Sequence, residues 1–169
     1  RKAVSEKVET HLTDKAADVA EIIDGRINAI FQLLEGFARM PLLTNTAVPY
    51  SEKEARLQKE ASFNKRFAQL NLYDLDGVRY TADGQKISVA DREWFRVASS
   101  GKNFLSEPLM SRSLNKLTLI FAVPVYNDAH TLVGVLNAVI LANSLSESIS
   151  DIVVGKTGEC YIIGLTGTI

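Results

Sequence analysis

The stretch KLTLIFAVPVYNDAHTLVGVLNAVIL, residues 116–141, decides the fold class of this chain. Two apolar runs, 116–126 and 131–141, are long and rich in β-branched residues, which is typical of strands. The four residues NDAH at 127–130 separate them, and polar residues of this kind favour a tight connection. The stretch therefore predicts a long β-hairpin within an antiparallel sheet.

Shorter strand patterns lie before this hairpin. Residues 69–84, QLNLYDLDGVRYTADG, predict a strand, a turn at Asp76-Gly77 and a second short strand, and NFLSEP at 103–108 predicts another. Between them, 91–100 has the pattern of a short helix that Gly101 ends. We therefore expect five strands with a helical insertion after the second strand.

The N-terminal quarter of the chain has helical periodicity. Apolar residues recur at steps of three and four from Val4 to Phe37, and charged residues fill the other faces. An unbroken helix would be about 50 Å long, which exceeds what a small domain covers. We therefore expect its first half to project or to pair with a partner helix, so that a homodimer through this helix is possible. The alternative is two helices that break near Asp24-Gly25.

Two capping boxes predict further helices. Ser51 with Glu54 three residues later predicts a helix that runs to about Phe67, after Pro41 has ended the first one. Ser144 with Glu147 predicts a short helix to about 152. The fold class is therefore α+β, with a long N-terminal helix backing an antiparallel sheet.

Composition excludes one class of partner. The 169 residues carry 19 Lys and Arg against 20 Asp and Glu, so there is no basic excess for nucleic acid binding. No run approaches the roughly 18 apolar residues that a membrane span needs. Because the chain begins at Arg1 and stops within an apparent strand, we expect it to be part of a longer protein, and the lack of a membrane segment here says little about that parent protein.

Motifs of catalysis and metal binding are incomplete. GKT at 155–157 lacks the glycine that a phosphate loop needs at position 150, which is Ser150. DLDG at 74–77 resembles the start of a calcium loop, but the later ligands do not follow. Neither His11 nor His130 has a second ligand at metal-binding spacing, and no nucleophile has a base nearby. We therefore expect no cofactor, no metal and no enzymatic activity.

An arginine beside aromatic residues is the strongest candidate site. Within DREWFRVASSGKNFLSEP, residues 91–108, Arg92 and Phe95 share one face of a short helix. This helix lies between two strands, where it can cover one face of the sheet. Arg92 could then direct its guanidinium at a carboxylate, in a cavity walled by Trp94, Phe95 and Phe104.

The same residues also fit a purely structural interpretation. Trp94 and Phe95 would then pack on the sheet as core residues. Arg92 would pair with Asp91 or Glu93, or extend its charged end into solvent. Both interpretations stay open at this point.

Three longer stretches, 72–84, 89–140 and 155–169, together resemble the double Cache family. The order of D-R-x-W-F, A-V-P-V-Y and L-V-G-V-L carries this resemblance. Members are extracytoplasmic sensor domains of bacterial methyl-accepting chemotaxis proteins, histidine kinases and diguanylate cyclases, anchored in the cell membrane. The resemblance implies a signalling helix over 1–37, a membrane-distal PAS-like module over 38–142, and over 143–169 a connecting helix and the first strand of a membrane-proximal module.

The resemblance also implies a ligand pocket. Arg92 and Trp94 match the residues that hold the ligand carboxylate in the amino-acid-binding subgroup. Phe95 and Ile87 stand where that subgroup has tyrosines, and Val139 stands where an aspartate grips the ligand's amino group. Without that aspartate an α-ammonium would be buried unpaired, so we expect a carboxylate or another small anion, or an empty pocket. A module that only dimerises or binds another protein is the remaining alternative.

Overall fold

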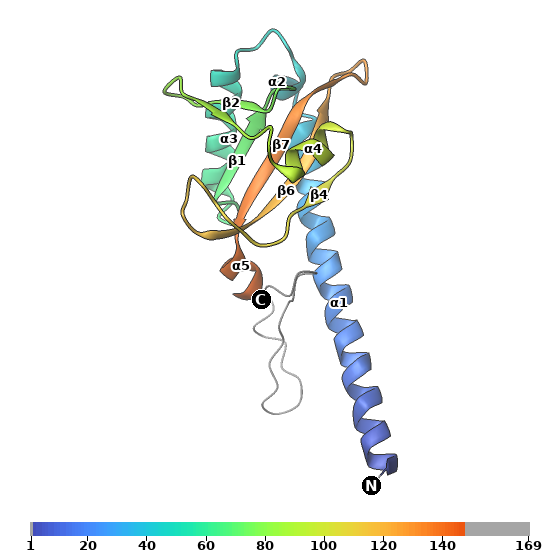
Figure 1. Cartoon of the computed structure of the whole chain (residues 1–169). Coiled ribbons are helices and arrows are strands. Elements are labelled where there is room, and N and C mark those ends of the chain that lie inside the picture. The colour runs from blue at the N-terminus through green and yellow to red at the C-terminus, as the bar shows by residue number, and fades with distance from the viewer. Residues whose placement is uncertain (1, 148–169) are drawn as a thin grey trace.

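The computed structural model describes residues 2–147, and Figure 1 shows a central antiparallel sheet with helices on both faces. Its centre is the predicted hairpin: β6 (Leu117–Tyr126) and β7 (Leu132–Leu141) pair antiparallel along nearly their whole length. The Asn127 side chain builds the connection by accepting hydrogen bonds from the backbone N–H groups of Ala129 and Thr131. The hairpin prediction is therefore confirmed.

Shorter strands complete the sheet on both sides of the hairpin. β1 (Gln69–Tyr73) pairs with β7, and β4 (Phe104–Leu105) and β5 (Leu109–Met110) pair with β6, giving the order β1-β7-β6-β4. β2 (Val78–Tyr80) and β3 (Lys86–Ser88) form a separate two-stranded sheet. The predicted strands are present, but β3 and β5 were not predicted. All three residues of β3 are exposed and β5 has only two residues, so neither leaves an apolar pattern in the sequence.

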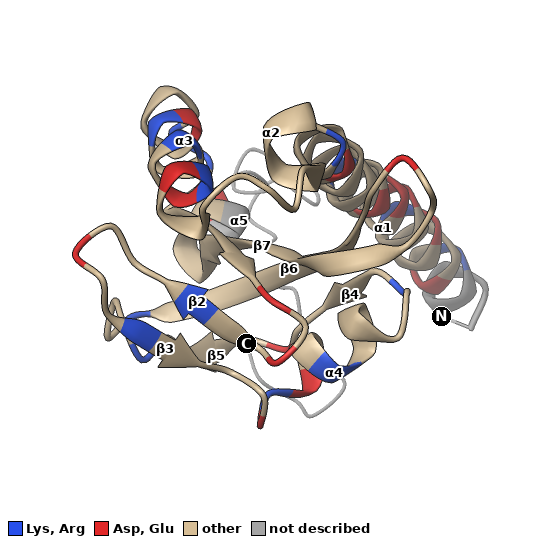
Figure 2. Ribbon diagram, turned by 90° about the horizontal axis from the view of Figure 1, so that it is seen from above, with Lys and Arg blue, Asp and Glu red and all other residues tan. Residues whose placement is uncertain are grey.

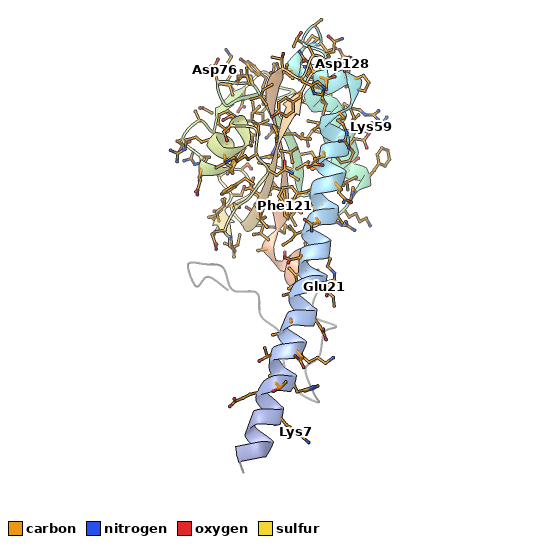
Figure 3. The ribbon with its side chains drawn as sticks, turned by 90° about the vertical axis from the view of Figure 1, so that its right-hand side faces the viewer. Lys7, Glu21, Lys59, Asp76, Phe121 and Asp128 are labelled. Atoms are coloured by element: carbon orange, nitrogen blue, oxygen red, sulfur yellow. The ribbon has the colours of Figure 1, made fainter. Side chains whose placement is uncertain are left out.

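The long N-terminal helix is continuous. α1 (Lys2–Ala38) passes Asp24-Gly25 without a break, so the two-helix alternative is wrong. Its second half packs on the sheet, whereas the part that carries Lys7 projects beyond it (Figure 3). The helix α2 (Pro41–Thr44) begins directly at Pro41. No helix within residues 2–147 is long and apolar enough to cross a membrane.

Both helices predicted from capping boxes are present, but neither has the predicted residue as its N-cap. α3 (Tyr50–Phe63) begins at Tyr50 as expected, but its N-cap is Pro49, whose side chain has no atom that could cap the helix, and the carboxylate of Glu54 pairs with Arg79 instead. It ends four residues before Phe67, which is buried in the core instead. α5 (Ala142–Glu147) begins directly after β7, before Ser144. The predicted continuation to 152, and with it most of the segment 143–169, lies outside the described residues.

The sheet separates two apolar cores. Alternate residues of a strand point to opposite faces, and Leu136, Ala138 and Ile140 of β7 join the core under α1 and α3. Val135 and Val139 join the second core, under α4 (Glu93–Ser99). Figure 2 shows α1, α2 and α3 on one side of the sheet and α4, β2 and β3 on the other. The second core is where the predicted site residues meet.

Candidate functional site

The predicted short helix is present as α4, which lies over the second core. Arg92, with an extended backbone, is its N-cap residue, and the chain turns away from the helix at Gly101. Gly101 has φ +91°, and a Cβ there would lie 2.7 Å from the hydroxyl of Tyr126. Glycine meets both conditions because it has no side chain, so the helix ends at this position.

Three aromatic rings form the centre of this core. Trp94 and Phe95 are each 5% exposed, and their ring centroids are 6.2 Å apart in an edge-to-face arrangement. The ring of Tyr73 lies 5.2 Å from Trp94 and 6.5 Å from Phe95, again edge-to-face. Val139 belongs to the same cluster, and Phe104 packs against it. The structure thus brings four of the predicted site residues together, and we call this group with Tyr73 the aromatic cluster.

Arg92 lies at the edge of the aromatic cluster and is half-buried. Its backbone is fixed, because its N–H donates to Val89 and its carbonyl accepts from Arg96. Asp91 binds Arg112 at 2.9 Å, and this hydrogen bond lowers the pKa of Asp91. Within residues 2–147 the Arg92 guanidinium has no hydrogen bond or ion pair. Arg92 thus forms no direct hydrogen bond or ion pair with Asp91 or Glu93 there, although its charge contributes to the lowered pKa of Asp91.

Ile87 does not join the aromatic cluster. It lies on β3, opposite Arg79 of β2, and is 38% exposed. The separate β2–β3 sheet thus carries it outside the second core.

A pair of asparagines on the same face was not predicted. Asn71 of β1 and Asn137 of β7 lie directly opposite one another, both 1% exposed. The side-chain amide of Asn71 donates to the side-chain oxygen of Asn137 at 3.0 Å, while the buried Oδ1 of Asn71 has no hydrogen-bond partner. The sequence signal was available, because each asparagine interrupts an apolar strand.

The hydroxyl of Tyr73 lies next to this pair. Burial raises the pKa of Tyr73 to about 12, and the hydrogen bonds with Asn137 and Asn71 lower it less strongly. Tyr73 therefore stays neutral at ordinary pH and can donate a hydrogen bond. Tyr73 and the asparagine pair therefore supply hydrogen-bond donors and one buried acceptor beside the apolar aromatic cluster, and polar groups in apolar surroundings suit small polar ligands. No group of three metal-binding side chains is present in the described part of the chain.

Two cavities lie elsewhere on the molecule. One, between the end of α1 and the β6–β7 connection, has about 570 Å³ and is lined by residues that include Glu35, Asn103 and His130. The other, which we call the base cavity, has about 410 Å³ and lies where α1 passes the end of β7. None of the six predicted site residues lines either cavity.

A family model described as a Cache domain matches residues 1–169. The chain belongs to the Cache family. This confirms the resemblance drawn from the sequence, together with the fold class. No curated protein matches the sequence.

Solved sensor domains share the fold. The sensor domain of Escherichia coli DcuS has a TM-score of 0.62 at 18% identity, over 76% of this chain and 98% of that one. The Pseudomonas aeruginosa chemoreceptor PctC in complex with GABA gives 0.65 at 20% identity, over 83% of this chain and 66% of that one. The sensory domain of the Campylobacter jejuni chemoreceptor Tlp3 with isoleucine bound has a TM-score of 0.62 at 13% identity, over 83% of this chain and 60% of that one. The chain thus spans about three fifths of the Tlp3 domain.

Proposed function

We propose that this chain is the extracytoplasmic ligand-sensing part of a bacterial transmembrane receptor, with a chemoreceptor as the parent protein. A histidine kinase or a diguanylate cyclase is the alternative parent, since sensor domains of the first kind share this fold. The observation that carries the proposal is Arg92, which is half-buried, forms no hydrogen bond or ion pair of its side chain within residues 2–147, and stands two residues before Trp94 of the aromatic cluster. Its ligand would bind between α4 and the sheet.

The charges around the aromatic cluster favour an anion. Arg92 supplies a planar set of donors that matches a carboxylate. Val139, at the position where the amino-acid-binding subgroup has an aspartate, is buried and offers no charge to an ammonium group. Burying an unpaired ammonium there would cost several kcal/mol, so an ordinary α-amino acid is disfavoured. The ligand class is therefore a small carboxylate or a related anion.

The asparagine pair narrows this class further. The free Oδ1 of Asn71 is a buried acceptor, and leaving it without a donor costs about 1–3 kcal/mol. A ligand hydroxyl or amide N–H would satisfy it without introducing a charge. We therefore favour a carboxylate that also carries a hydroxyl or an amide group.

Signalling would follow from the position of α1 on the opposite face of the same sheet. A ligand that binds one arrangement of α4 better than another shifts the balance between them by the difference in its affinities. β6 and β7 contact both α4 and α1, so a movement of α4 on the sheet reaches α1 through two strands. The long helix would carry the displacement towards the membrane.

A thermal-shift screen of small carboxylates tests the proposal, since a ligand raises the melting temperature by mass action. We expect a hydroxy- or amido-carboxylate to raise it, and Arg92→Ala to abolish the shift. Arg96→Ala is the matched control, because Arg96 is an exposed arginine on the same helix. Binding of free amino acids in the millimolar range or tighter, lost on Arg92→Ala, would overturn the ligand class. In the intact receptor, a full ligand response after Arg92→Ala and Trp94→Ala together would reject the site.

The burial of Trp94 and Phe95, each 5% exposed, favours a second candidate function, a module that dimerises without a ligand. Val8 and Leu12 on the projecting part of α1 are about half exposed, at 53% and 49%, and could meet a second copy. Sedimentation would distinguish the two functions. A dimer that forms without any ligand and is lost on Leu12→Glu, together with a screen that finds no carboxylate, supports this second function.

A further inference from the structure

The base cavity joins three segments that are distant in the sequence. Arg26 and two isoleucines of α1 form one wall, Arg66 from the loop between α3 and β1 forms another, and Ile140 and Ser144 close it. Figure 1 shows this region at the lower end of the sheet, where α5 begins. It lies on the α1 face, because Ile140 belongs to the core under α1. The base cavity is therefore separate from the aromatic cluster on the other face.

Two arginines give the base cavity its charge. Arg26 is half-buried, and its Nη1 is shielded from solvent without a hydrogen-bond partner in the part of the chain that the structure describes. The side chain of Arg66 is in no ion pair or hydrogen bond within residues 2–147. Among the described residues that line the base cavity there is no Asp or Glu. A buried guanidinium N–H without an acceptor is costly, and an anion between the two arginines would remove that cost.

The remaining lining indicates what kind of anion fits. Ile22, Ile30 and Ile140 present apolar surface to the same cavity. An inorganic anion would satisfy the arginines but would leave this surface in contact with water. A carboxylate with a short hydrocarbon chain satisfies both, because its head group pairs with guanidinium and its chain covers the isoleucines.

We propose that the base cavity is a second ligand site, which binds a small organic carboxylate between Arg26 and Arg66. A ligand there would connect α1 to the loop before β1 and so hold α1 against the sheet. The inference does not rest on the function proposed for the aromatic cluster, since the two sites share no residue.

Calorimetric titration of the chain with butyrate tests this site. We expect binding with a Kd of about 1 mM, and a loss of affinity of at least about tenfold on Arg26→Ala or Arg66→Ala, as expected for one charge-assisted hydrogen bond. Lys65→Ala, which removes the same charge from an exposed neighbour, and Arg92→Ala should both leave the affinity unchanged. Arg26→Lys should lose affinity too, because an ammonium cannot pair with both carboxylate oxygens in parallel.

The controls separate the possible failures. Arg66 is exposed, so its variant is expected to fold even if Arg26→Ala does not, and thermal unfolding checks this. Absence of butyrate binding, or affinity that both arginine variants retain, would overturn the proposal. Affinity lost on Arg92→Ala would overturn it as well, by moving the ligand to the aromatic cluster. Inorganic phosphate serves as the second probe, and binding as tight as that of butyrate would refute the carboxylate assignment.

Discussion

The ion pair between Glu54 of α3 and Arg79 of β2 allows a sharp test of the electrostatics of this fold. Their side chains are 3% and 11% exposed, so both charges are removed from water. One carboxylate oxygen accepts from Nε of Arg79 at 2.9 Å, from its Nη2 and from Gln58. The other carboxylate oxygen is buried without a partner in the described chain. This pair joins the β2–β3 sheet to α3.

Removing one partner should cost far more than removing both. Glu54→Leu leaves the Arg79 guanidinium buried without its counter-charge, and Arg79→Met leaves the carboxylate with Gln58 alone. Each single change should lower the free energy of unfolding by about 3–5 kcal/mol. The double variant replaces both charges by apolar groups of similar size, and we expect it to lie within about 1 kcal/mol of the original chain. The two single costs should therefore exceed the cost of the double variant by about 5 kcal/mol or more, which is the coupling energy of the pair.

Urea denaturation with linear extrapolation measures these four free energies without adding salt that screens charges. The exposed pair Arg56–Glu60 supplies the control, since its side chains are 45% and 21% exposed. Arg56→Met should change the free energy of unfolding by less than about 1 kcal/mol. Single variants at Glu54 and Arg79 whose costs simply add would refute the view that desolvated charge dominates this contact.

Two further predictions concern the strands. Because the pKa of Tyr73 is raised to about 12, the unfolded chain loses this proton first. The free energy of unfolding should therefore fall by up to about 2.7 kcal/mol as the pH rises from 10 to 12. Urea titrations at several pH values measure this loss, and Tyr73→Phe should remove it. At Gly134 a Cβ would lie 2.6 Å from the backbone oxygen of Tyr73. Gly134→Ala should therefore push β1 away from β7 and lower the free energy of unfolding by about 1–3 kcal/mol. Gly36→Ala, in α1 with open space around it, should instead raise the midpoint of urea unfolding slightly, and a loss at both glycines would contradict the steric explanation.

Long periodic elements were predictable from the sequence because each repeats its pattern many times. α1, β6 and β7 are all present as expected. The N-cap residues of the shorter helices were not predicted correctly. A capping box is a local motif, and a residue distant in the sequence can bind one of its side chains instead. Glu54 shows this directly: Arg79, 25 positions further on, takes the carboxylate that the capping box would have used.

The candidate site was predictable only where its residues are close in sequence or match the family pattern. Arg92, Trp94 and Phe95 lie within four positions, and the structure keeps them together. Asn71 and Asn137 meet only through the register of β1 on β7, which periodicity does not determine. Arg26 and Arg66 come from a helix and a loop whose relative placement depends on the whole core.

β7 has one property with a wider consequence. Val139 and Ile140 are consecutive, yet the first packs under α4 and the second lines the base cavity beside α1. A single peptide plane therefore separates the two chemically different sides of the molecule. Any tilt of that plane moves both side chains at once. A change at one of them can therefore reach the other without a series of side-chain contacts between them. The two ligand sites proposed above would then face one another across the width of one strand.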